Sequence, residues 1–160
     1  MNNEHNLERF LNAQERDYHT ALNEIKNGRK QSHWMWYIFP QLKGLGQSHN
    51  SYFYGISDLS EAKAYIANPL LGERLIEIAG ALLDLESNDA LDIMGTPDHY
   101  KLKSSMTLFS SVPNSNAIFT KVLEKFFQGR MSRRTLKLLN KNNNMDKWTS
   151  IIGASFQIHF

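Results

Sequence analysis

Apolar residues recur every three or four positions along most of the chain, which is the period of an amphipathic helix. The first such run covers residues 7–25, and Gly28 follows where a C-terminal cap is expected. A short second helix should begin with Ser32 as its N-cap. This helix should end near Ile38, because Pro40 disfavours helical dihedral angles at the residue before it.

Five more helices are predicted by the same period and by residues that typically cap helix ends. The spacing of Asp58 and Glu61 is that of a capping box, and Asn68 followed by Pro69 is typical of a helix start. The other three helices should begin near residues 96, 118 and 132. Only residues 148–160 hint at the alternation of a strand, so we predict an all-α fold of about seven helices.

The length and composition of the chain are those of one globular domain. It has 160 residues, of which 41% are hydrophobic and 21% are charged. We predict a single compact helical domain over residues 1–140 and a C-terminal extension over residues 141–160, with disorder in the asparagine run 140–144. No apolar run approaches the roughly 18 residues of a membrane span, and the N-terminus lacks the pattern of an export signal. We therefore expect a cytoplasmic protein with no membrane partner.

The chain lacks the familiar sequence signatures of metal and nucleotide sites. Without cysteine it cannot form disulfides, use a thiol nucleophile or ligate zinc through sulfur. Its six histidines do not have metal-ligand spacing, and it contains no Walker, GxGxxG or GxSxG motif. We therefore expect neither a bound metal nor a cofactor.

Basic residues crowd the last quarter of a chain whose net charge is only +2. They are Arg130, Arg133, Arg134, Lys137, Lys141 and Lys147. Such a cluster can attract phosphates or nucleic acid. A solvated helix face is the simpler explanation, so we keep nucleic-acid binding only as an alternative.

The stretch SHWMWYIFPQ, residues 32–41, has six consecutive apolar or aromatic residues after its histidine. A helix with this sequence has no polar face, so protein must surround it on nearly every side. Its two indole N–H groups then need hydrogen-bond partners. Plain core packing and the wall of a binding site are both open explanations. His33, preceded by Lys30, stands at the helix start, where a phosphate or carboxylate is favoured.

A second polar stretch, DHYKLKSSMT, covers residues 98–107. Asp98 and Lys101 are three residues apart on one helix face, where a surface ion pair is the simple explanation. Ser104, Ser105 and Thr107 put three hydroxyls into four positions. Hydroxyls inside a helix must bond something, and this set fits the lining of a pocket.

Several blocks of the sequence resemble a bacterial family, the domain of unknown function 1810, whose members are often labelled calpastatin by automatic transfer. The blocks are GRKQSHWMWYIFPQLKGLGQS, EAKAYIANPLLGERL and KLKSSMTLF, and the resemblance covers about residues 7–139. It implies a helical fold but no particular activity, and the residues give no support for protease inhibition. One departure is Asn68, because family members commonly have histidine before this proline.

We hypothesise that the two stretches meet around one pocket for a small anionic ligand. Analogy with other small helical domains suggests a nucleotide-derived or ADP-ribose-derived ligand. The predicted ligand-binding residues are Lys30, Trp34, Trp36, Gln41, Lys101, Lys103, Ser104, Ser105 and Thr107. His33 and Asp98 would move protons if the protein is an enzyme, which the sequence leaves open.

Two other functions remain open at this point. The protein could be an interaction module without chemistry, built on an exposed aromatic patch. It could also bind nucleic acid through the basic C-terminal helix.

Overall fold

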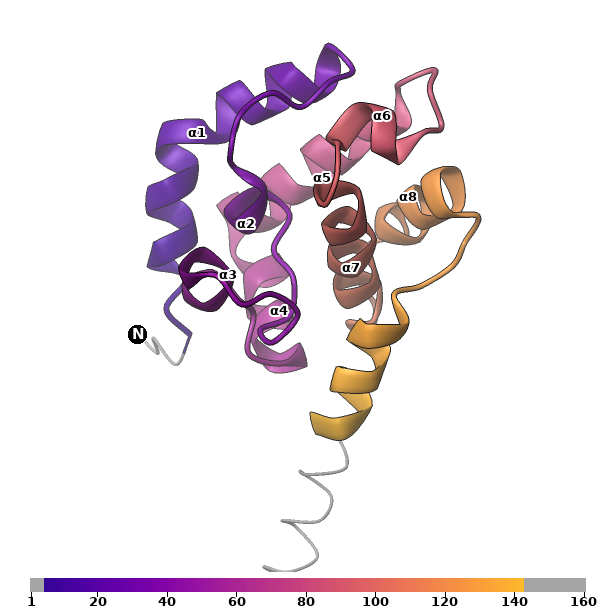
Figure 1. The fold of residues 1–160 in the computed structure, drawn as a ribbon. Helices are drawn as coiled ribbons and strands as arrows, with labels where there is room; N and C mark the ends of the chain where they lie inside the picture. Colours follow the sequence, from indigo (N-terminus) through magenta and orange to yellow (C-terminus); the bar gives the residue numbers. More distant parts are fainter. Residues whose placement is uncertain (1–4, 143–160) are drawn as a thin grey trace, which may run out of the picture.

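The computed structural model describes residues 5–142, which are entirely helical apart from loops and one isolated β-bridge (Figure 1). The helices are α1 (Glu8–Lys26), α2 (Met35–Ile38), α3 (His49–Phe53), α4 (Leu59–Ala67), α5 (Pro69–Leu83), α6 (Ala90–Met94), α7 (Asp98–Ser110) and α8 (Ile118–Phe127). A last helical segment follows at residues 133–142. The predicted all-α fold is therefore confirmed.

The described range contains nine helices where the sequence predicted about seven. The two additional ones, α3 and α6, are five residues long. A helix of this length makes little more than one turn, so it shows no apolar periodicity.

Most predicted helix boundaries are confirmed by side-chain caps. Asp58 accepts a hydrogen bond from the backbone N–H of Glu61 at 2.9 Å. Asn68 ends α4, and its side-chain oxygen accepts from two backbone N–H groups of α5 at 3.1 Å each. At the last helical segment, Ser132 accepts from the backbone N–H of Thr135 at 3.2 Å. These caps fix where the chain turns between helices.

Two predicted helix starts are wrong. The N-cap of α2 is Trp34 and not Ser32, whose hydroxyl donates to the carboxylate of Glu24 instead. The N-cap of α7 is Pro97 and not Thr96, and no side chain caps this helix. At α2 a contact outside the local sequence, between Ser32 and Glu24, takes the capping hydroxyl.

The helices share one core. Helix α5 packs against α1, α4 and α8, while α7 packs against α4, α6 and α8. Figure 1 shows the chain leaving α8 and returning to the end of α7 before the last helical segment begins. This return places residues 130–136 beside α7, where the candidate site lies.

Two sequence-based expectations concern the ends of the chain. Residues 140–142, where the asparagine run begins, are helical, and the rest of the predicted extension lies outside the described residues. Within residues 5–142, no helix combines the length and the apolar character needed to cross a membrane.

Candidate anion-binding cleft

The two stretches that were predicted to face each other are in contact. The ammonium of Lys30 lies 2.8 Å from one carboxylate oxygen of Asp98, and that of Lys101 lies 3.6 Å from the other. The Lys101 ammonium also lies 5.0 Å from the centroid of the Trp36 ring, within range of a cation–π contact. Lys101 therefore joins the tryptophan-rich stretch to α7, and Asp98 joins α7 to Lys30, which lies just before that stretch.

The two tryptophans of this stretch have different surroundings. Trp34 is 1% exposed, and its indole N–H donates to the carboxylate of Glu24 at 3.0 Å. Trp36 is half-buried, and its indole N–H is buried without a hydrogen-bond partner among residues 5–142. Trp34 is thus enclosed by protein, whereas Trp36 has an unused donor.

The carboxylate of Glu24 fixes the loop that leads into α2. Burial raises the pKa of this group, but hydrogen bonds from the Ser32 hydroxyl, from the backbone N–H groups of Gln31 and Ser32 and from the indole of Trp34 lower it to about 2. The group is therefore charged at neutral pH. This role could not be predicted from the sequence, because a glutamate on an amphipathic helix is normally a surface residue.

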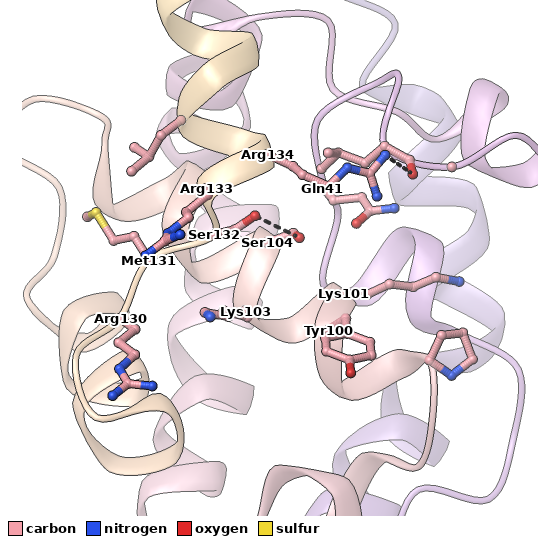
Figure 2. Close-up of a pocket in the computed structure, with 14 residues that line it drawn as sticks. Gln41, Tyr100, Lys101, Lys103, Ser104, Arg130, Met131, Ser132, Arg133 and Arg134 are labelled. Atoms are coloured by element: carbon pink, nitrogen blue, oxygen red, sulfur yellow. Dashed lines mark hydrogen bonds between the residues drawn. The ribbon is translucent and has the colours of Figure 1, made fainter.

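A cleft of about 950 Å³ lies on the side of α7 next to residues 130–136 (Figure 2). Its walls come from the loop after α2, from the first half of α7 and from the chain around the start of the last helical segment. Five cationic side chains line it: Lys101, Lys103, Arg130, Arg133 and Arg134. No acidic side chain is among the lining residues, so the cleft has a positive potential.

Figure 2 shows how the cleft is built from segments far apart in the sequence. Lys101 and Tyr100 lie on one side, and Lys103 and Arg130 lie on the other. The ring of Tyr100 packs against that of His99 at a centroid distance of 3.8 Å, but Tyr100 is 65% exposed, so the rest of its surface can contact a ligand.

Four of the nine predicted ligand-binding residues line this cleft: Gln41, Lys101, Lys103 and Ser104. The other five do not: Lys30, Trp34, Trp36, Ser105 and Thr107. Neither of the two predicted proton-transfer residues lines it. His33 is exposed, and Asp98 forms ion pairs with two lysines.

The hydroxyls of α7 have three different environments. Ser104 lies at the cleft and donates to the hydroxyl of Ser132 at 3.5 Å. Thr107 donates to the carbonyl of Lys103 and accepts from the backbone N–H of Ser132, both at 2.8 Å. Ser105 is fully buried in the core, without a hydrogen-bond partner in the described part of the chain. Thr107 therefore positions the chain that carries the arginines of the cleft.

The sequence did not group the arginines with the lysines of α7. In the sequence, Arg130, Arg133 and Arg134 belong to a basic C-terminal cluster that suggests nucleic-acid binding, and nothing marks Tyr100 as a site residue. The contact that unites the two walls, between Ser132 and Thr107, joins residues 25 positions apart. A hydrogen bond from a backbone N–H to a hydroxyl at that separation has no recognisable sequence signal.

The fold and the cleft define an all-helical protein with a cationic cavity between α7 and the chain that follows α8. Comparison with family models shows that the chain belongs to the family described as "Protein of unknown function (DUF1810)", whose model matches residues 4–139. The family resemblance seen in the sequence is thereby confirmed.

A solved structure supports the same fold. The chain is similar to a conserved hypothetical protein from Mycobacterium tuberculosis, known from a crystal structure, with 45% sequence identity and a TM-score of 0.82. The similarity covers 84% of this chain and 96% of that one. No curated protein matches the chain.

Proposed function

We propose that the protein binds a small phosphate-bearing ligand of nucleotide size in the cationic cleft. The observation that carries this proposal is the set of five cations without a lining carboxylate. Lys103, Arg130, Arg133 and Arg134 form no ion pair with an acidic side chain inside residues 5–142. Their charges are therefore available to an anion from solution.

The size and the lining of the cleft favour an organic phosphate over a simple ion. Pockets for small molecules have volumes of about 300–1,000 Å³, and the cleft has about 950 Å³. The exposed ring of Tyr100 offers a surface on which a flat base can stack, and the side chains of Gln41 and Ser104 offer hydrogen bonds. A nucleotide or an ADP-ribose derivative combines a flat base with the negative charge that these residues would recognise.

The proposal assigns binding and no reaction. His33 and Asp98 lie outside the lining of the cleft, so their predicted part in proton transfer gains no support. An interaction module without chemistry also stays a prediction.

Calorimetric titration with ADP and with ADP-ribose at low ionic strength tests the proposal. We expect saturable binding of at least one of them with one ligand per chain. Arg133→Gln and Lys103→Gln should each weaken it by about tenfold or more, because a hydrogen bond to a charged group contributes about 1.5–3 kcal/mol.

Lys121→Gln is the matched control. Lys121 is an exposed residue of α8 outside the cleft, so the substitution removes the same charge elsewhere. Absence of binding by both ligands, or equal losses in the control and in the cleft variants, would contradict the proposal.

A further inference from the structure

A second, much smaller cavity lies directly beside the cationic cleft. It has a volume of about 10 Å³, which is room for one atom the size of a water oxygen. Gln41 and Lys101 line both this cavity and the cleft. Trp36 from α2 and Tyr54 after α3 are among its other walls. The two spaces are therefore neighbours that share two lining residues.

Trp36, a residue that lines this cavity, also carries an unused hydrogen-bond donor. The indole N–H is buried and has no hydrogen-bond partner among residues 5–142, although Trp36 lines the cavity. A buried N–H group without an acceptor is costly and rare in native proteins. An oxygen atom in the cavity would supply the missing acceptor.

The charge next to the cavity favours a negatively charged oxygen. The Lys101 ammonium lies 5.0 Å from the centroid of the Trp36 ring and 3.6 Å from a carboxylate oxygen of Asp98. The other oxygen of that carboxylate is held by Lys30 at 2.8 Å. Asp98 is thus shared by two lysines and only partly neutralises Lys101, which lines both the cleft and the cavity and leaves positive charge where they meet.

We propose that the small cavity is the inner end of the cleft and that the indole N–H of Trp36 donates a hydrogen bond to a phosphate oxygen of the bound ligand. The inference rests on the proposed function, because the phosphate enters through the cleft. It adds a specificity element, since the cavity accepts a terminal oxygen of a phosphate and has no room for a larger group. The terminal phosphate of the ligand is therefore the part that reaches Trp36.

Trp36→Phe tests this inference, because it keeps an aromatic ring in place and removes only the N–H donor. We expect the affinity for ADP to fall by about tenfold, the effect of one hydrogen bond to a charged group. Adenosine, which has no phosphate, should bind both proteins equally weakly. Trp34→Phe is the control, because the indole N–H of Trp34 donates to Glu24. The affinity of the Trp34→Phe protein for ADP should equal that of wild type.

The NMR spectrum of the wild-type protein gives a second measurement, which does not depend on the folding of a variant. The indole N–H signal of Trp36, assigned by its absence in Trp36→Phe or, if that variant is unstable, by selective labelling, should move downfield when ADP is added. The signal of Trp34 should stay in place, because its carboxylate partner does not change.

The possible results separate this inference from the proposed function. If ADP binds Trp36→Phe as tightly as wild type, or binds without moving the Trp36 signal, the cavity holds only a trapped water and the inference is wrong, while the cleft remains a binding site. If wild type binds ADP-ribose but not ADP, the inference is wrong and the proposed function holds. If wild type binds neither ADP nor ADP-ribose, the inference and the proposed function fail together.

Discussion

Neighbouring hydroxyl residues of α7 differ sharply in what they contribute. Thr107 satisfies the backbone N–H of Ser132 and bonds the carbonyl of Lys103, and it is fully buried. Ser105 is equally buried, but its hydroxyl has no partner in the described structure. A buried hydroxyl without a partner loses its bonds to water and gains none from the protein.

We therefore expect opposite effects from removing these two hydroxyls. Ser105→Ala should leave the free energy of unfolding unchanged or raise it by up to about 1 kcal/mol, because no hydrogen bond is lost. Thr107→Val should lower it by about 1–3 kcal/mol, because the buried N–H of Ser132 loses its acceptor. Urea unfolding monitored by circular dichroism measures both values. A large destabilisation by Ser105→Ala would show that its hydroxyl has a partner after all.

The sequence could predict that these hydroxyls need partners, but it could not identify them. Helix periodicity shows which residues share a face, as it does for Asp98 and Lys101. It cannot show that residue 132 returns to α7, because that contact is made across 25 positions. The candidate lysines of the site were therefore found from the sequence, and the arginine wall was not.

At the scale of elements, the sharp connection between α4 and α5 depends on one small residue. Asn68 is both the C-cap of α4 and the N-cap of α5, so the two helices follow each other without a loop. Gly72, one turn into α5, faces the end of α4. A Cβ atom at this position would lie 2.1 Å from the backbone carbonyl oxygen of Ile66, which cannot move aside without shifting the helix.

Two glycine-to-alanine substitutions in the same helix should therefore have opposite signs. Gly72→Ala should lower the free energy of unfolding by at least about 1–3 kcal/mol, because its methyl group overlaps backbone. Gly80→Ala should raise it by about 0.5–1 kcal/mol, because alanine favours helix and the nearest atom, a side-chain methyl carbon of Ile118, is 3.7 Å away. Thermal and urea unfolding of both variants provide the measurement. A stable Gly72→Ala protein would mean that the helices do not meet so closely.

The accuracy of the helix predictions followed the strength of the local signals. The capped starts at Asp58, Asn68 and Ser132 were predicted correctly because the capping residue bonds the helix that it precedes. The start of α2 was not, because the hydroxyl of Ser32 is taken by Glu24 on another helix. Local sequence is therefore sufficient where the cap is local and insufficient where a distant group competes for it.

For the whole molecule, the placement of charge matters more than its total. The net charge is only +2, yet five cations converge on one cleft without an acidic neighbour in its lining. Part of the basic cluster that suggested nucleic-acid binding thus forms one wall of the candidate site for a small anion. The two functions now concern the same surface, and they differ in how far binding should extend beyond the cleft.

Substitution of Lys137 distinguishes binding of a small ligand from binding of a nucleic-acid strand. This exposed residue belongs to the last helical segment but does not line the cleft, so Lys137→Gln should leave the affinity for ADP unchanged. A single strand that continues from the cleft along the helix would contact Lys137 as well. Its binding would then weaken in the variant, and its affinity would fall steeply with salt, with a slope of roughly −0.7 per phosphate neutralised.

Titration of ADP and of a fluorescent 15-nucleotide single strand, each over a range of salt concentrations, distinguishes these two cases. The proposed function predicts that ADP competes with any strand binding and that Lys137→Gln changes neither affinity. A strand that binds tightly, responds to Lys137→Gln and is not displaced by ADP would instead assign the cationic surface to nucleic acid. The five cations of the cleft would in that case be one part of a longer phosphate-binding track.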